Sequence, residues 1–307
     1  LMLLQRRARE LGINLVFETE APDPRPYMET HDLVVAADGL NSRSRSTFAE
    51  VFKPDIDTRK CKFVWLGTQQ KFDDAFTFIF EKTKHGWVWA HAYQFDKDTA
   101  TFIVECTEGA WKRAGLDKAS EAETLAFCEK LFAKYLDGAT LSTNAKHLRG
   151  SAWLNFPRIV CDTWHRGNLI LMGDAAHTAH FSIGSGTKLA IEDAIKLAAV
   201  LHGGKPLAEA LNEYHAERQI EVLKLQNAAR NSTEWFEHID RYAALEPLQV
   251  TYSLLTRSQR VSHENLRVRD ADFVRRIETT FAGGEAKPPM FAPLKLRELE
   301  IANRVVV

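Results

Sequence analysis

The sequence predicts a mixed α/β (α+β) fold with three parts: a domain built on a parallel sheet, an inserted sheet that is mostly antiparallel, and a C-terminal helical region. A strand, a sharp turn, a glycine-rich loop and a helix follow one another in Gly167–Ala198, an order typical of ligand-binding α/β domains. Aromatic and β-branched runs separated by polar turns occupy residues 61–105 and favour antiparallel strands. Amphipathic spacing over Pro206–Asn231 and across Glu234–Phe281 predicts helices.

The chain begins with a predicted helix over Met2–Leu11, which leads into a predicted strand over Gly12–Glu20. No GxGxxG fingerprint of a dinucleotide-binding turn occurs in the 307 residues.

The inserted sheet is predicted from four runs, which are Phe63–Trp65, Phe76–Phe80, Trp87–Tyr93 and Thr99–Glu105. His91 and Tyr93 alternate along the third run and therefore face the same side of the sheet. That side is either the core of the sheet or a substrate pocket.

A helix is predicted over Trp111–Asp137, and another strand over Leu148–Asn155. The apolar stripe of this helix consists of Leu125, Cys128, Leu131, Phe132 and Tyr135.

A predicted turn follows the short apolar run Asn168–Met172, which has the length of a strand. Gly173 permits a backbone conformation that other residues resist. Asp174 then places a carboxylate at the carboxyl end of the strand, where ligands of open α/β folds bind. The alternative is that Asp174 only caps the following turn.

The loop after this turn is rich in small residues. Gly184 and Gly186 allow backbone N–H groups to approach a ligand closely, and the helix that begins near Thr187 directs its positive end at it. A carboxylate that binds hydroxyls, followed by such a helix start, suits a polyol joined to an electron-rich ring.

A second motif lies upstream in DLVVAADGLNSRSR, which contains Asp38, Gly39, Ser42 and Arg45. The alternative interpretations are that Asp38 is a turn residue before Gly39 and that Arg45 is a solvated helix charge.

Together these motifs resemble those of the single-component FAD-dependent aromatic hydroxylases. GDAAH followed by FSIGSGTKLAIEDA resembles their second FAD motif, and DGLNSRSR resembles their DGxxSxxR motif. The segments CKFVWLGTQQKFDDAFTFIF and HAYQFDKDTATFIVE are similar to the bifunctional salicylyl-CoA 5-hydroxylase/oxidoreductases and the anthraniloyl-CoA (2-aminobenzoyl-CoA) monooxygenases. Violacein-pathway indole hydroxylases are more distant relatives.

The resemblance implies an FAD-binding Rossmann-like domain. It implies that NAD(P)H reduces FAD, that O2 forms a flavin C4a-hydroperoxide, and that this species hydroxylates salicylyl-CoA or 2-aminobenzoyl-CoA at C5. His180, which lies directly before the glycine-rich loop, is the catalytic candidate, and the alternative is a structural role. His91 and Tyr93 are candidate substrate contacts, and no metal site is expected. The candidate FAD-binding residues are Asp38, Gly39, Arg45, Gly173, Asp174, Gly184, Ser185, Gly186 and Thr187.

The resemblance also concerns the two ends of the chain. In this family a GxGxxG turn lies at the N-terminus, so we expect the domain to lack its first βαβ unit. Glu285–Val307 resembles the opening of an old-yellow-enzyme-like FMN barrel, with a strand over Arg304–Val307, although a proline-bounded tail is the alternative. We expect this polypeptide alone to be colourless, poorly soluble and inactive.

The expected domains are a partial FAD-binding domain (1–60), the substrate-domain sheet (61–160), the second FAD motif with the C-terminal helices (161–284), and a linker with the start of the barrel (285–307).

Composition excludes few classes of protein. A formal net charge of −1 gives no reason to expect binding to nucleic acid or to an anionic membrane. No apolar run approaches the roughly 20 residues of a spanning helix. Four cysteines without a CxxC pair indicate reduced thiols and a cytoplasmic protein. A homodimer is possible.

Six arginines lie within Arg257–Arg276. They could bind the phosphates of coenzyme A, or they could form a solvated helix face with Glu264, Asp270 and Asp272. Two functional alternatives stay open. One is a flavin hydroxylase of a free aromatic or indole substrate, and the other is a catalytically silent fragment.

Overall fold

The computed structural model describes residues 1–20, 23–72, 75–143, 153–285, 287 and 289–305, which form two compact units. Unit 1 consists of Leu1–Asp57, Arg158–Ala179 and Gly184–Lys224. Unit 2 consists of Thr58–Pro157, His180–Ile183 and Leu225–Val307.

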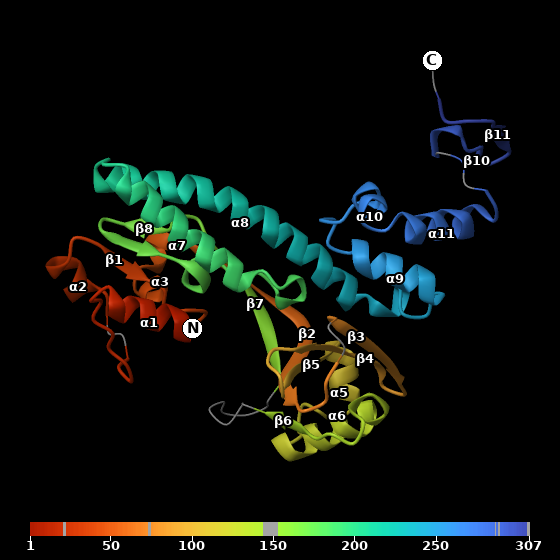
Figure 1. The fold of residues 1–307 in the computed structure, drawn as a ribbon, viewed down its shortest axis with the longest axis horizontal. Helices are drawn as coiled ribbons and strands as arrows, with labels where there is room; N and C mark the ends of the chain where they lie inside the picture. Colours follow the sequence, from red (N-terminus) through yellow and green to blue (C-terminus); the bar gives the residue numbers. More distant parts are fainter. Residues whose placement is uncertain (21–22, 73–74, 144–152, 286, 288, 306–307) are drawn as a thin grey trace. The chain divides into compact units, whose positions relative to one another are not determined.

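Unit 1 contains a small sheet in the order β1-β9-β8. β1 (Val34–Ala36) runs parallel to β9 (Leu169–Leu171), and β8 (His165–Arg166) runs antiparallel to β9. β9 is completely buried, as the apolar run predicted. The helices of this unit are α1 (Met2–Glu10), α2 (Arg25–Thr30), α3 (Arg43–Thr47), α4 (Ala49–Phe52), α7 (Gly186–His202) and the first part of α8 (Leu207–Glu237) (Figure 1).

The predicted strand over Gly12–Glu20 is wrong. The structure has no strand in these residues, and the side chains of Ile13, Val16 and Phe17 are all more than half exposed. A strand is stable only when its N–H and C=O groups pair with a neighbour. Among the described residues of unit 1, β1 pairs only with β9, so this segment has no partner strand.

Most of a six-stranded sheet belongs to unit 2, whereas the first residues of β2 and the last residues of β7 belong to unit 1. The antiparallel pairing of this sheet confirms the prediction for residues 61–105 (Figure 1). Its path is β3-β4-β5-β2-β6, with β7 paired to β2. The strands are β2 (Pro54–Thr68), β3 (Thr77–Thr83), β4 (Gly86–Gln94), β5 (Ala100–Cys106), β6 (Leu141–Thr143) and β7 (Leu154–Cys161).

The two faces of this sheet are covered by different helices, because successive side chains of a strand point to opposite faces. Val88 and Ala90 of β4 belong to the core formed with α5 (Glu108–Arg113) and α6 (Glu121–Leu136). Trp89 lies between them in sequence and packs instead with Phe236 of α8.

The helix predicted over Trp111–Asp137 is interrupted. α5 ends at Arg113, Gly115 adopts a left-handed φ of 74°, and Ser120 starts α6 through a capping box with Glu123. The predicted apolar stripe is confirmed, because Cys128 and Phe132 are buried and the other three residues pack against the same core.

α8 is longer than predicted, and its 31 residues correspond to roughly 45 Å of helix. The expected segment 161–284 is therefore divided. The first part of α8 belongs to unit 1, whereas its last turns pack Trp235 and Phe236 on the sheet of unit 2. The predicted helices after residue 234 are confirmed as α9 (Pro247–Thr256), α10 (His263–Arg269) and α11 (Ala271–Ala282).

Two predicted strands lie partly outside the described residues. Of the strand expected over Leu148–Asn155, residues 148–152 are not described, and β7 begins at Leu154. Arg304 and Val305 are not in a strand, which corrects the prediction for Arg304–Val307 as far as the structure describes it. The pairing there is made earlier, by the hairpin of β10 (Leu294–Leu296) and β11 (Leu299–Ile301).

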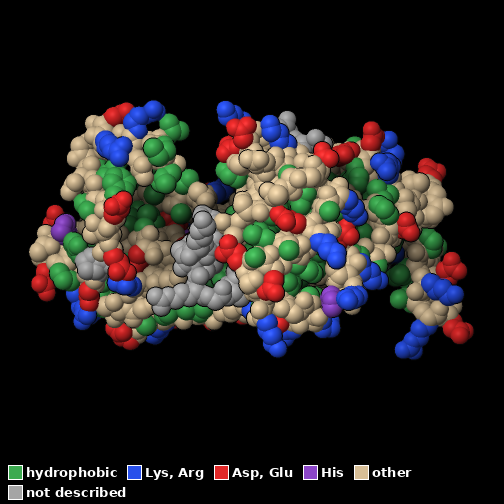
Figure 2. Space-filling model, turned by 90° about the horizontal axis from the view of Figure 1, so that it is seen from below, with side chains coloured by type: hydrophobic (Ala, Val, Ile, Leu, Met, Phe, Trp, Pro, Cys, Tyr) green, Lys and Arg blue, Asp and Glu red, His purple; other side chains and the backbone are tan. Residues whose placement is uncertain are grey.

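Three further observations bear on partners and compartment. All four cysteines are buried and free. In the described residues, no helix combines the length and the apolar character that crossing a bilayer requires. Figure 2 shows basic and acidic side chains interspersed on the face that it draws, so that face carries no large patch of one sign.

Candidate functional site

The predicted turn after β9 is a single 3-10 turn, η2 (Gly173–Ala175), in unit 1. Gly173 has a φ of 60°, and a Cβ at this position would lie 3.2 Å from the Cβ of Ala190 in α7. Both the conformation and the close approach of α7 therefore require glycine.

The carboxylate of Asp174 is exposed at the carboxyl end of β9 and has no hydrogen-bond partner among the described residues. Partial desolvation raises the pKa of this carboxyl, and the nearby His177 opposes the increase. Asp174 therefore does not cap the turn, and it remains available to accept a hydroxyl.

A buried carboxylate of α7 stabilises this turn through hydrogen bonds. Asp193 accepts hydrogen bonds from the Gly173 amide (3.0 Å), from Nε2 of His177 (2.7 Å) and from Nε of Arg218 (2.8 Å). Burial would raise the pKa of Asp193, but the hydrogen bonds outweigh it and lower the pKa. This role of Asp193 was not predicted from the sequence. The sequence feature that could have indicated this role is an acidic residue at helical spacing from Leu189 and Leu197.

Arg45 joins the two predicted motifs. Its Nη1 donates to the carbonyl oxygens of Ala175 (2.9 Å) and Asp174 (3.4 Å), and its Nη2 donates to that of Leu40 (2.6 Å). Only 5% of Arg45 is exposed, so the interpretation as a solvated helix charge is wrong. Backbone carbonyls of both motifs accept hydrogen bonds from the guanidinium, so Arg45 connects the two motifs.

The Asp38–Gly39 turn is ordered by hydrogen bonds from a hydroxyl and a backbone amide that follow it in the chain. Asp38 accepts from Oγ of Ser42 (2.6 Å) and from the amide of Ser44 (3.0 Å), and Gly39 has a φ of 78°. Desolvation raises the pKa of Asp38, but these hydrogen bonds prevail and the pKa lies below its ordinary value. The same Ser42 hydroxyl caps α3 by accepting from the amide of Arg45.

The N-terminus of α7 is open. Gly184 has a φ of 59°, and a Cβ at Gly184 or Gly186 would meet nothing within 4 Å. Ser185 precedes the helix without a side-chain cap, and the first turn holds no acidic residue. The N–H groups near Thr187 therefore offer an uncapped positive helix end.

His180 belongs to unit 2 and precedes the 3-10 turn η3 (Phe181–Ile183). Its ring stacks on Phe181 with 4.2 Å between ring centroids, and its Nδ1 accepts from the amide of Ser182 (3.2 Å). Burial lowers the pKa of His180 to about 4, although the charge of Glu105 opposes this effect. The imidazole is therefore neutral at physiological pH.

Glu105 of β5 brings the two candidate histidines together. Its Oε2 lies 3.2 Å from Nε2 of His91, and its Oε1 lies 3.9 Å from Nε2 of His180. Glu105 was not among the site residues predicted from the sequence. Its signal was a single acidic residue inside the apolar strand run TFIVEC.

His91 and Tyr93 do face the same side of the sheet, because the rings of both contact Phe76. Their surroundings differ, however. His91 is completely buried against Phe78 and Phe236, whereas Tyr93 is half-buried and stacks on Phe76 at 5.1 Å. For His91, the interpretation as part of the core is the better one.

Aromatic side chains gather around Phe181, and we call this group the aromatic layer. Phe63 lies 4.9 Å from Phe181 between ring centroids, Trp65 and Phe156 lie 6.0 Å from it, and Phe156 also contacts the ring of His180. Trp65 is 47% exposed, so the layer offers an aromatic surface to a planar ring.

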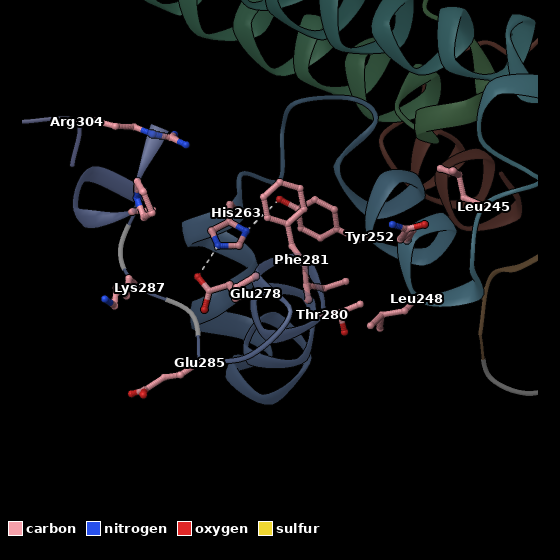
Figure 3. A pocket seen from close by; sticks show the side chains of 15 residues that line it. Leu245, Leu248, Tyr252, His263, Glu278, Thr280, Phe281, Glu285, Lys287 and Arg304 are labelled. Atoms are coloured by element: carbon pink, nitrogen blue, oxygen red, sulfur yellow. Dashed lines mark hydrogen bonds and ion pairs between the residues drawn. The ribbon is translucent and has the colours of Figure 1, made fainter. Parts of the chain in front are cut away.

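A cavity of about 870 Å³ lies elsewhere in unit 2, beside α9 and α11, and contains none of the predicted site residues (Figure 3). Within it, His263 lies between the hydroxyl of Tyr252 and the carboxylate of Glu278. Its walls include the apolar Leu245, Leu248 and Phe281.

Two of the six arginines of 257–276 are paired with carboxylates. Arg267 bonds to Glu264 and Glu278, and Arg275 bonds to Asp272, as expected for a solvated helix face. Arg257 differs, because it donates to the carbonyl of Ser182 (2.8 Å) and covers the ring of Phe78. In the described part of the chain, no group of three His, Cys, Asp or Glu side chains is arranged to hold a metal ion.

Comparison with known proteins adds to this geometry. Residues 25–229 match the family model described as FAD binding domain. The chain is 39% identical, over its whole length, to salicyloyl-CoA 5-hydroxylase from a Streptomyces species. It is 38% identical, over 78% of its length, to 3-hydroxy-4-methyl-anthranilyl-[aryl-carrier protein] 5-monooxygenase from Streptosporangium sibiricum. The chain spans 60% and 62% of these relatives, respectively.

Among solved structures, the chain is similar to 2-methyl-3-hydroxypyridine-5-carboxylic acid oxygenase in its tetrameric form. The TM-score is 0.57 at 19% identity, over 89% of this chain and 69% of the other. At this identity the likeness concerns the fold, and it confirms the mixed α/β architecture.

Proposed function

Because the chain belongs to the FAD binding domain family, we propose that it is the flavin-binding and substrate-recognising part of an aromatic monooxygenase that hydroxylates an aryl-CoA thioester. The observation that carries this proposal is the arrangement in unit 1. One buried arginine ties the Asp38–Gly39 turn to the Gly173–Ala175 turn, and the uncapped start of α7 belongs to the same unit.

The residues of unit 1 fit FAD. The exposed carboxylate of Asp174 would accept a hydroxyl of the ribityl chain, and it has no competing hydrogen-bond partner among the described residues. Gly184 and Gly186 leave open space in front of α7, so that the amides of Gly184–Thr187 would stabilise negative charge on the flavin ring. Arg45 and Asp38 would position these groups.

Bound flavin would supply the activation of O2 and the transfer of one oxygen atom to the ring, with NAD(P)H as the reductant. The protein would bind and orient the flavin and the substrate, and it would exclude water from them. The aromatic layer of unit 2 would hold the aromatic acyl group, and the neutral His180 beside Phe181 would help to position it. Tyr93, half-buried beside Phe76, would be a further contact.

Salicylyl-CoA is the substrate we favour, with 2-aminobenzoyl-CoA as its close analogue and position 5, para to the heteroatom, as the site of oxidation. Two relatives support this class, since their names describe an aromatic acyl group on coenzyme A or on an aryl-carrier protein. A hydroxylase of a free aromatic or indole substrate is the second candidate, supported by the aromatic layer, which does not itself require a carrier.

The natural protein, freed of flavin, would be titrated with FAD by fluorescence quenching. NAD(P)H oxidation would then be followed after addition of salicylyl-CoA, 2-aminobenzoyl-CoA, free salicylate or indole. We expect FAD to bind and a CoA thioester to accelerate oxidation most. Acceleration by free salicylate or indole alone would favour the second candidate, and absence of FAD binding would contradict both. An FMN barrel after residue 307 and a GxGxxG segment before residue 1 stay predictions, which the intact mass and flavin content of the natural protein would test.

A further inference from the structure

Glu105 is a carboxylate buried inside an aromatic core. Only 1% of it is exposed, and its two oxygens face an indole and two imidazoles. A buried carboxylate needs hydrogen-bond donors to compensate for lost hydration, so the partners of each oxygen define what Glu105 does.

One oxygen is fixed as an acceptor. Trp89 lies directly opposite Glu105 in the register of β4 and β5, and its Nε1–H donates to Oε2 at 2.8 Å. An indole N–H can only donate. His91 approaches the same Oε2 through Nε2 at 3.2 Å, so the orientation of the carboxylate in the sheet is determined.

The other oxygen faces His180. Oε1 has no hydrogen-bond partner among the described residues, and Nε2 of His180 lies 3.9 Å away. Because Nδ1 of His180 accepts from the Ser182 amide, the neutral ring must carry its hydrogen on Nε2. The Nε2–H donor of His180 therefore lies 3.9 Å from a carboxylate oxygen that has no hydrogen-bond donor among the described residues.

We propose that Glu105 is a positioning residue of the substrate site, whose carboxylate acts together with the Ser182 amide to stabilise the Nε2–H tautomer and the ring orientation of His180. His180 in turn supports the stacked ring of Phe181, on which the aromatic layer is centred. The identity of the bound ligand, an aromatic acyl group, rests on the proposed function, whereas the link from Glu105 to His180 rests on the geometry of unit 2.

The substitution Glu105→Gln isolates this link. Gln has nearly the same shape, and the indole N–H of Trp89 requires the amide oxygen of Gln at the Oε2 position. Its NH2 group then takes the Oε1 position and faces Nε2–H of His180, so that two donors oppose each other. We expect His180 to relieve this opposition by moving its hydrogen to Nδ1, which also breaks the hydrogen bond that Nδ1 accepts from the Ser182 amide.

The tautomer would be measured in the natural protein with isotope-labelled histidine, by long-range nitrogen–proton NMR, and the His180 signals would be assigned with His180→Gln. The matched control is Glu81→Gln. This half-buried carboxylate of β3 accepts from Tyr135 and pairs with Lys134, away from the histidines. We expect the Nε2–H form in the wild type and in the control, and loss of that form in Glu105→Gln.

A wild-type Nδ1–H tautomer would overturn the proposal even if Glu105→Gln failed to fold, and so would an unchanged tautomer in folded Glu105→Gln. A second measurement uses the natural protein with FAD. Glu105→Gln should lower the product formed per NAD(P)H consumed by about 10- to 100-fold, the range that misplacement of reacting groups produces, while FAD affinity stays unchanged.

A shifted tautomer with unchanged product yield would contradict the positioning role. If the wild-type protein binds no FAD, the proposed function fails, but the tautomer result still decides whether Glu105 orients His180.

Discussion

Nη1 of Arg45 donates a 2.9 Å hydrogen bond to the carbonyl oxygen of Ala175, 130 residues later in the chain. Two motifs that are separate in sequence are thereby held by one buried side chain. Backbone carbonyls, which every residue offers, are the acceptors, so the arrangement depends on the planar fork of arginine and not on the identity of its partners.

Replacing Arg45 by Lys should therefore damage unit 1. An ammonium group cannot reach the carbonyls of Leu40 and Ala175 with the same fork, and we expect a loss of about 2–3 kcal/mol in the free energy of unfolding, together with weaker FAD binding. Thermal or urea unfolding and FAD titration would measure this. Arg43→Lys, an exposed neighbour paired with Glu20, is the control, and equal stability of both variants would show that the link is unimportant.

Asp174→Ala should weaken FAD binding by about 1.5–3 kcal/mol, the contribution of a hydrogen bond to a charged group. The carboxylate is exposed at the end of β9 and has no competing partner among the described residues, so its removal should leave the fold intact. Fluorescence titration of the natural apoprotein would measure affinity, with Asp32→Ala, at an exposed acid before β1, as the control. Unchanged affinity would refute the assignment of Asp174 to the flavin.

Asp193 should contribute to acid stability. Its pKa is lowered in the folded protein, so its contribution is complete above the unfolded value of about 3.9 and is lost as the pH falls through the lower folded value. Asp193→Asn should be less stable at neutral pH and should lose less stability below about pH 4. Urea unfolding across this range would test it, with exposed Asp162→Asn as the control. Parallel pH profiles of variant and wild type would contradict the interpretation.

His180 should affect the stability of the protein in a higher pH range than Asp193 does. Burial lowers its pKa to about 4, whereas an unfolded histidine titrates near 6.5. Protonation therefore favours the unfolded chain, and stability should decline by about 3 kcal/mol as the pH falls from about 6.5 to about 4. His180→Gln should flatten this part of the profile. The exposed His202→Gln should not, and a His180→Gln profile as steep as that of the wild type would show that the imidazole is accessible to water.

The parts of the fold that follow from local pattern could be predicted from the sequence. The turn at Gly173, the start of α7 and the antiparallel strands are encoded by residues near one another in the chain. The strand expected at Gly12–Glu20 failed because a strand also needs a partner, which local pattern does not reveal.

Asp193 and Glu105, which connect separate parts of the fold, could not be predicted for the same reason. Asp193 and Glu105 act through partners that only the folded chain brings near. Asp193 bonds to Gly173, which is 20 residues away, and Glu105 bonds to Trp89 across the register of two strands. In the sequence Glu105 is a single acidic residue in an apolar strand run and Asp193 directly follows a second acidic residue, Glu192, and neither pattern identifies the partner.

The proposed function is tested most directly by mass spectrometry of the products that the natural protein forms from salicylyl-CoA and from 2-aminobenzoyl-CoA, with NAD(P)H, FAD and isotope-labelled O2. We predict a product that carries one labelled oxygen atom at position 5 of the ring while the thioester remains intact. Consumption of NAD(P)H without labelled product from either thioester, or labelling of free salicylate or indole alone, would contradict the proposal.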